Sequence, residues 1–145
     1  MSNLWLFMVM FFSGIMVAVQ PSINARLAQR IGLLEAASVS FAVGTGALLL
    51  ASLVVGRGHW KGAGGALWWE WTGGFLGAFF VAATILAIPR IGTAATMAAV
   101  IAAQLLTGLV MDHYGLFGFR GAPIDAWRVV GIVCLLLGAI LVFRR

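Results

Sequence analysis

Polar side chains in the first apolar stretch of the chain are the first candidates for chemistry. Ser13, Gln20 and Asn24 are spaced by seven and four residues, which places them on one face of a helix. Pro21 removes the helical hydrogen bond to the carbonyl of Val17 and so adds an acceptor to this segment. A polar patch beside an interrupted helix is typical of substrate sites in transporters. The alternative is that Gln20 and Asn24 only cap the helix and bond the neighbouring backbone.

A second polar stripe falls in the fourth apolar stretch. Gln104, Gly108 and Asp112 follow one another at intervals of four residues, with Thr107 beside them. Gln104 lies mid-span, where a polar side chain either forms a hydrogen bond to a neighbouring helix or contacts the substrate. Asp112 is expected near a helix carboxyl end, where the helix dipole disfavours an anion, so it needs a partner. The sequence leaves open whether that partnership is a structural salt bridge or part of a pathway. The candidate partners are Arg120, Arg128 and a bound cation.

The chain lacks the residue clusters that catalysis or cofactor binding needs. His59 and His113 are isolated, and no metal-ligand cluster, phosphate-binding loop or activated nucleophile accompanies them. No acid occupies the middle of an apolar stretch, which argues against the central carboxylate of many proton-coupled exporters of cationic drugs. We therefore expect neither an enzyme nor a cofactor-binding protein.

These candidate residues lie in a chain that is too apolar for a water-soluble fold. Of its 145 residues, 63% are hydrophobic and only 9% are charged, and the mean hydropathy is +1.08. A bilayer core needs about 20 apolar residues per helix. Five stretches meet that length without the polar face of a soluble helix or the alternation of a barrel strand. Their expected bounds are residues 4–25, 34–55, 67–88, 92–111 and 126–143.

The expected fold is therefore an all-α integral membrane protein, a single transmembrane domain over residues 1–145 with five transmembrane helices. Pro89 is expected to end the third helix, because proline removes a donor and clashes with the preceding turn. Such a protein is embedded in the lipid bilayer, which is therefore an expected binding partner. The net charge is +5, but the basic side chains are scattered between the apolar stretches, where they suit lipid headgroups rather than nucleic acid.

The basic residues do not favour one side of the membrane. Five lie on the side of the first loop, and four lie on the opposite side together with the terminal amine. The first group is Arg26, Arg30, Arg90, Arg144 and Arg145, and the second is Arg57, Lys61, Arg120 and Arg128. The hypothesis is that the chain inserts both ways and pairs with an inverted copy of itself. All six tryptophans fall at one end of the expected bundle, so one copy has an aromatic belt at one membrane interface and two inverted copies have a belt at both. The alternative is that the tryptophans are simply placed unevenly in a short chain.

Motifs in both halves of the chain carry a family resemblance. They are Gln20-Pro21-Ser22-Ile23-Asn24-Ala25-Arg26-Leu27, Ser40-Phe41-Ala42-Val43-Gly44-Thr45, Trp71-Thr72-Gly73-Gly74-Phe75-Leu76-Gly77, Pro89-Arg90-Ile91-Gly92, and Gln104 leading to Asp112-His113-Tyr114-Gly115-Leu116-Phe117-Gly118. In this order and spacing they resemble the YdcZ-like half-size family of the drug/metabolite transporter superfamily. Ala103 departs from the glycine that this family tends to have before the glutamine, which puts the closest packing at that point in doubt.

The resemblance implies a multi-pass, five-helix protein of the bacterial-type inner (cytoplasmic) membrane that works as an antiparallel homodimer or as paired opposite halves. The chain would then be half of an inverted-repeat transporter. We expect a secondary transporter or exporter of small metabolites with alternating access and a midplane site lined by Gln20, Asn24 and Gln104. The small-molecule substrate is unidentified. The alternatives are a dual-topology channel for small ions and a membrane partner subunit without flux of its own.

Overall fold

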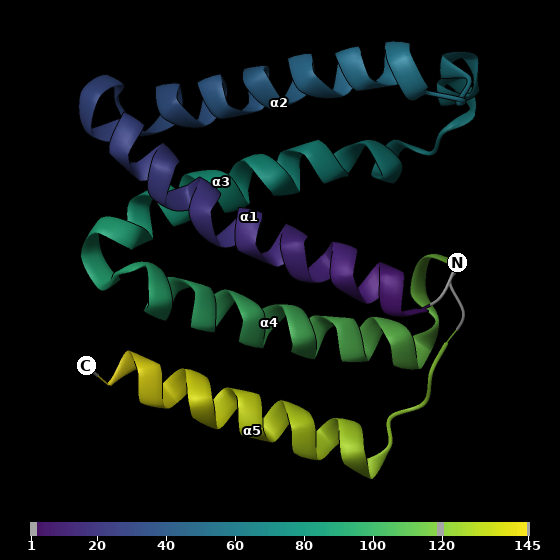
Figure 1. Cartoon of the computed structure of the whole chain (residues 1–145). Coiled ribbons are helices and arrows are strands. Elements are labelled where there is room, and N and C mark those ends of the chain that lie inside the picture. The colour runs from purple at the N-terminus through teal and green to yellow at the C-terminus, as the bar shows by residue number, and fades with distance from the viewer. Residues whose placement is uncertain (1–2, 119–120, 145) are drawn as a thin grey trace. The chain divides into compact units, whose positions relative to one another are not determined.

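The computed structural model describes residues 3–118 and 121–144, and helices dominate it (Figure 1). Within these residues five helical segments are long and apolar enough to cross a membrane, and no strand occurs. The α-helices are α1 (Asn3–Ile31), α2 (Leu33–Val55), α3 (Thr72–Ile91), α4 (Thr93–Tyr114) and α5 (Ala126–Phe143). The expected all-α membrane fold with five transmembrane helices is confirmed.

The first helix, α1, is continuous through its proline. It runs to Ile31 instead of ending near Ala25, and Pro21 is fully buried inside it. Proline still lacks the backbone donor for the carbonyl of Val17, so this turn has one helical hydrogen bond fewer. The expectation of an interrupted first helix is therefore wrong, because the surrounding turns hold the helical path across Pro21.

The third helix, α3, also continues through a proline. It includes Pro89 and ends at Ile91, so the expectation that Pro89 ends this helix is wrong. Pro89 lies in the last turn, where it removes the helical hydrogen bond to the carbonyl of Ile85 while only two residues of the helix follow it. In the same turn the Arg90 guanidinium donates a hydrogen bond of 2.7 Å to the carbonyl of Leu86, which ties this side chain back onto its own helix.

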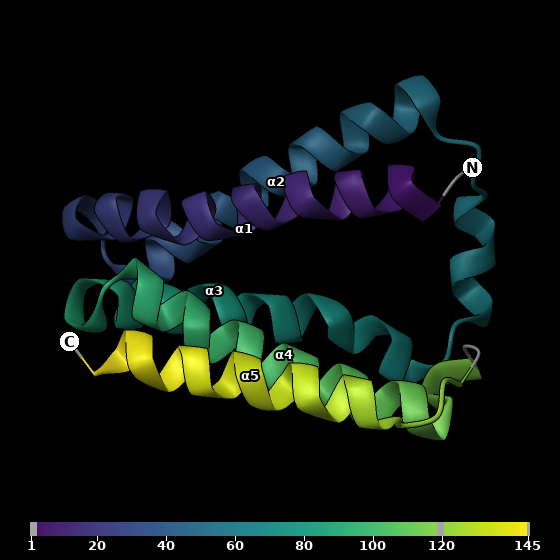
Figure 2. The same cartoon turned by 60° about the horizontal axis from the view of Figure 1, so that its bottom comes forward.

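The residues form two compact units, Met1–Arg90 and Ile91–Arg145. In the first unit, α1 and α2 join at Gly32 and splay apart away from this turn (Figures 1 and 2). Gly32 has φ of +100°, a conformation that side chains disfavour. A Cβ atom at this position would also collide with the carboxyl group of Glu35. Glycine is therefore required for the tight turn that sets the α1–α2 pair.

The buried core of the first unit lies close to this turn. Ala36 and Ala37 at the start of α2 pack with Val81 and Ile85 of α3. These four buried side chains supply the van der Waals contact that membrane helices rely on without a hydrophobic driving force. The partly buried side chains around this cluster are Leu27, Ala28, Leu33 and Phe80. Two short 3-10 helices, η1 (Trp60–Gly65) and η2 (Trp68–Trp71), connect α2 to α3.

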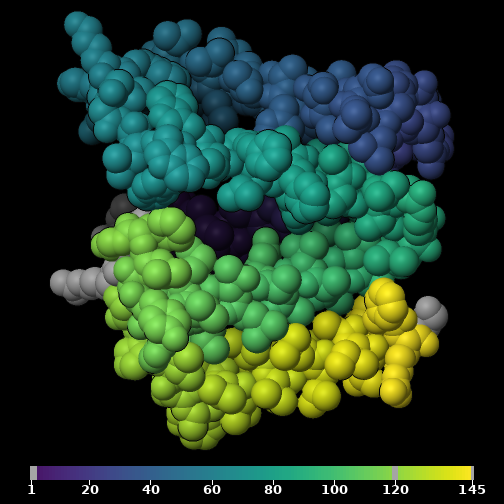
Figure 3. Space-filling view, turned by 180° about the vertical axis from the view of Figure 1, so that it is seen from behind, coloured from purple at the N-terminus to yellow at the C-terminus, as the bar shows by residue number. Residues whose placement is uncertain are grey.

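In the second unit, α4 and α5 lie side by side and run in opposite directions (Figures 1 to 3). α4 ends at Tyr114 and is capped by Gly115, which has φ of +57°, and the 3-10 helix η3 (Leu116–Gly118) follows. The backbone N–H of Ala122 donates a hydrogen bond of 2.8 Å to the carbonyl of Asp112, so the loop folds back on the end of α4. The N-cap of α5 is Asp125, whose carboxylate accepts a hydrogen bond of 2.8 Å from the backbone N–H of Arg128.

Candidate substrate pathway

The polar residues predicted on one face of the first helix line one groove on α1. Ser13, Gln20 and Asn24 share an open groove of about 540 Å³ with apolar side chains. The other lining residues are Met16, Val17, Val19 and Ile23. A neighbouring cavity of about 510 Å³ shares Ser13 and Met16 with it and reaches Trp5. A mostly apolar trough that carries three polar side chains therefore follows much of α1.

The three polar side chains of this trough differ in their hydrogen bonding. The Ser13 hydroxyl donates to the carbonyl of Val9 at 2.9 Å, within its own helix. Asn24 is only 5% exposed, and its amide Nδ2 donates to the hydroxyl Oγ of Ser40 on α2 at 3.1 Å. Gln20 is exposed and makes no hydrogen bond with any residue in the ranges that the structure describes. Asn24 therefore joins α1 to α2, whereas Gln20 offers a free amide to the trough.

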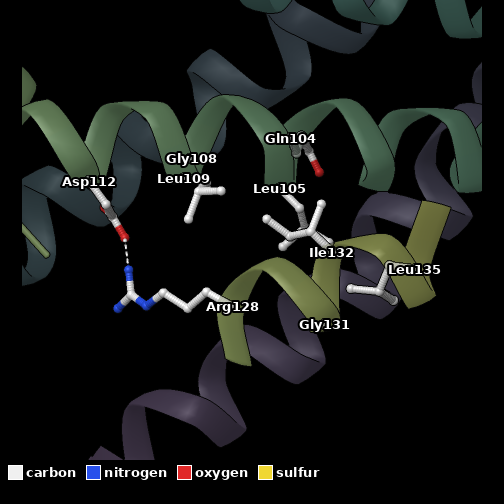
Figure 4. A pocket seen from close by; sticks show the side chains of 9 residues that line it. All are labelled: Gln104, Leu105, Gly108, Leu109, Asp112, Arg128, Gly131, Ile132 and Leu135. Atoms are coloured by element: carbon white, nitrogen blue, oxygen red, sulfur yellow. Dashed lines mark hydrogen bonds and ion pairs between the residues drawn. The ribbon is translucent and has the colours of Figure 1, made fainter. Parts of the chain in front are cut away.

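The polar stripe predicted on the fourth helix lines a different groove, within the second unit. Gln104, Gly108 and Asp112 border a cavity of about 350 Å³ between α4 and α5 (Figure 4). Thr107 is exposed but does not line this cavity. The partner of Asp112 is Arg128, with 3.4 Å between Oδ2 and Nη1. Arg120, the other residue expected to pair with Asp112, lies outside the described residues, as does Arg145 of the charge balance.

A repeated tripeptide reveals buried polar residues that the spacing argument missed. Arg-Ile-Gly occurs at residues 30–32 and again at 90–92, and both glycines have positive φ, +100° and +82°. Asn24 precedes the first glycine by the same number of residues as Thr84 precedes the second, and both are buried. Likewise Ala36 follows the first glycine at the same spacing as Thr96 follows the second, and both are buried. The two helix-to-helix turns thus repeat both a sequence and a pattern of burial. This repeat is the signal in the sequence that could have found both threonines.

Both threonines are nearly inaccessible and bond their own helices. Thr84 is 3% exposed and its hydroxyl donates to the carbonyl of Val81 at 2.9 Å. Thr96 is 4% exposed and its hydroxyl donates to the carbonyl of Gly92 at 2.7 Å. Threonine hydroxyls with such backbone bonds are satisfied in a membrane and still retain an acceptor lone pair. These residues therefore bond the backbone on either side of the second turn, at Gly92, and add polarity close to it.

The fold and these grooves define the class of the protein. Five membrane-spanning helices, with polar side chains placed in troughs rather than in a soluble module, make it a multi-pass integral membrane protein. In the described parts of the chain no group of three or more His, Cys, Asp or Glu side chains gathers as metal ligands. The helices themselves thus carry the polar groups that an activity would use.

Comparison with known proteins gives the family. The family model described as "Putative inner membrane exporter, YdcZ" matches residues 5–141. The relative "Inner membrane protein YdcZ" of Escherichia coli (strain K12) is 32% identical over 139 residues, which cover 92% of this chain and 91% of the relative. No solved structure matches the chain. The chain belongs to the YdcZ family of inner membrane proteins, which supports an exporter or transporter role and a multi-pass location in the inner membrane. This is a family of exporters, not of enzymes.

Proposed function

We propose that the chain is a secondary transporter of small metabolites, without enzymatic activity, and that its substrate pathway follows the trough on α1. The observation that carries this proposal is the exposed amide of Gln20 in a trough that is otherwise mostly apolar. A polar side chain within hydrocarbon is costly unless a partner or water satisfies it. A transported molecule with hydrogen-bonding groups would supply that partner, with Ser13 and Asn24 on either side.

The transporting unit that we propose is an antiparallel homodimer of two oppositely inserted copies. The nearly even division of basic residues between the two sides supports insertion in both directions, because orientation follows their imbalance. Two inverted copies form equivalent halves that can exchange inward-open and outward-open states, which is the basis of alternating access. Gln104 and Thr107 on α4 remain predicted pathway residues of this dimer. Asp112, also predicted there, is held by Arg128 in the second unit.

A flux measurement with matched glutamine variants tests the pathway. Substrates are first found by screening a metabolite library for uptake into vesicles that hold the purified protein. Gln20→Leu removes the exposed amide and should lower the flux about tenfold, the effect of losing one hydrogen bond of about 1.4 kcal/mol. Gln29→Leu makes the same change nine residues further on, on the opposite face of α1, and should leave the flux near the wild-type value. Equal fluxes in wild type and Gln20→Leu would remove α1 from the pathway.

The kind of flux separates a carrier from the two alternatives. A carrier gives a saturable rate that substrate on the opposite side of the membrane stimulates. A dual-topology channel instead gives ionic current without exchange. A subunit without flux of its own would be inactive alone and active only with a co-expressed membrane partner.

Charge variants test the antiparallel pairing independently of the substrate. Arg26→Gln with Arg30→Gln removes basic residues from one side, and Arg57→Gln with Lys61→Gln removes them from the other. Each double variant should insert predominantly one way and lose flux, because the inverted partner becomes scarce. Co-expression of the two variants should restore the flux. Full activity of either variant alone would contradict the antiparallel dimer.

A further inference from the structure

The groove between α4 and α5 is polar at one end and apolar along its walls. Asp112 and Arg128 stand at one end, and the side chains of Leu105, Leu109 and Ile132 point into the space between the helices (Figure 4). Leu135 continues the apolar wall on α5, and Gln104 lies at the far end on α4. Eight residues of helix separate Asp112 from Gln104, so the groove is about 12 Å long. Its shape and polarity match a molecule with a charged head and an apolar chain.

The charged end of the groove lies at the level of the membrane surface. Asp112 is in the last turns of α4, and Asp125 is the N-cap of α5. Both helices are membrane spans, so their ends meet the headgroup layer and the apolar walls lie in the hydrocarbon. The exposed fractions of Leu105 and Leu135, 38% and 49%, show that the walls are open rather than sealed. An acyl chain could therefore lie along them, with its headgroup beside the charges.

The charges at this end suit a zwitterionic headgroup. In the Arg128 guanidinium, Nη1 lies 3.4 Å from Oδ2 of Asp112, and Nε lies 3.9 Å from Oδ2 of Asp125. Two carboxylates facing one guanidinium leave one negative charge uncompensated among these three residues. A phosphate would bind the guanidinium, and an ammonium group would offset the second carboxylate. A headgroup with only negative charge lacks the ammonium group that would offset the second carboxylate, so it would be repelled by that carboxylate.

We propose that the α4–α5 groove is a binding site for a phospholipid whose headgroup carries both a phosphate and a primary amine. The phosphate binds Arg128, the ammonium donates hydrogen bonds to Asp112 and Asp125, and one acyl chain lies along the leucines toward Gln104. Primary amines donate hydrogen bonds to carboxylates, whereas trimethylated amines cannot. The site therefore distinguishes phosphatidylethanolamine from its trimethylated form, phosphatidylcholine. This binding does not depend on the proposed transport.

Glycine variants test the groove without removing its charges. Gly131 lines the groove, and a Cβ atom there has no neighbour within 4 Å, so Gly131→Leu is expected to place its side chain in the groove. Gly46→Leu on α2 makes the same substitution at a helical position that is equally open and outside the groove. Both variants replace a helical glycine by a stronger helix former, so both should fold. A difference in lipid retention between the two variants therefore reports the effect of filling the groove.

Native mass spectrometry of protein taken from bilayers of defined composition measures the retained lipid. The bilayers contain equal amounts of phosphatidylethanolamine, its trimethylated form and phosphatidylglycerol. We expect the wild type and Gly46→Leu to retain phosphatidylethanolamine about tenfold over the other two lipids, the effect of one charge-assisted hydrogen bond at a partly exposed site. Gly131→Leu should lose this retention. Asp112→Asn should reduce the preference for the primary amine.

Several results would overturn the lipid site. Equal retention of all three lipids would remove the headgroup recognition, and unchanged retention in Gly131→Leu would place the lipid elsewhere. Displacement of the lipid by water-soluble phosphoethanolamine would show that the acyl chain is not bound. Loss of flux in Gly131→Leu without any selective lipid retention would assign the groove to the transported substrate instead. Failure of transport by the wild type, with lipid retention intact, would reject the proposed function and leave this site standing.

Discussion

The hydrogen bond between Asn24 and Ser40 joins α1 to α2, and its contribution to stability can be measured directly. The donor and acceptor are 3.1 Å apart, and Asn24 is 5% exposed. Hydrogen bonds between membrane helices contribute about 0.6 kcal/mol on average and about 1.7 kcal/mol at most, because the separated helices find other partners. The near-complete burial of the amide places this bond in the upper half of that range. A double-mutant cycle of Asn24→Ala and Ser40→Ala should therefore give a coupling energy of about 1 kcal/mol.

Reversible unfolding in mixed micelles, followed by circular dichroism, provides the four free energies of this cycle. Ser38→Ala supplies the control, because the Ser38 hydroxyl donates to the carbonyl of Leu34 in its own helix at 2.8 Å. Its coupling with Asn24→Ala should be within about 0.3 kcal/mol of zero, the usual limit of additivity. A coupling between Asn24 and Ser40 no larger than that of the control would refute the assignment of Asn24 to helix pairing.

Three further variants test the turns and the ion pair. Gly32→Ala should destabilise the protein by about 1–2 kcal/mol in the same unfolding assay, because it forces a side chain into positive φ beside Glu35, whereas Gly44→Ala in open helical surroundings should be neutral or stabilising. The opposite ranking would contradict the role of the turn. Asp125→Ala should cost about 0.5–2 kcal/mol through loss of the α5 N-cap, and Asp125→Asn should recover most of it; equal losses would exclude capping. Asp112→Asn should cost at most about 1 kcal/mol, and the difference should shrink at high salt, since the Asp112 and Arg128 side chains are 56% and 40% exposed.

The five helices could be predicted from the sequence, because each apolar stretch is long enough to cross hydrocarbon and no soluble fold could cover so much apolar surface. The helix ends were harder. Pro21 and Pro89 suggest breaks, yet α1 and α3 continue through them. The proline rule describes the loss of one hydrogen bond, and a membrane helix continues where the surrounding turns hold its path across that loss.

The composition of each polar face was predictable, but its partners were not. Helical spacing places Ser13, Gln20 and Asn24 together, and the structure confirms this arrangement. The pairing of Asn24 with Ser40 depends on the register of α1 against α2, which the turn at Gly32 sets and which spacing within one helix does not contain. Gln104 and Asp112 line a groove together with residues of α5, and this arrangement likewise depends on how the two helices pack.

Topology measured at the carboxyl terminus tests the antiparallel transporter most directly. One fusion carries a phosphatase that is active only outside the cytoplasm, and the other carries a fluorescent protein that folds only inside it. Because the basic residues are divided almost evenly between the two sides, we predict substantial activity from both fusions at matched expression. A signal from one fusion alone, with no oppositely inserted partner in the membrane, would contradict the antiparallel pair.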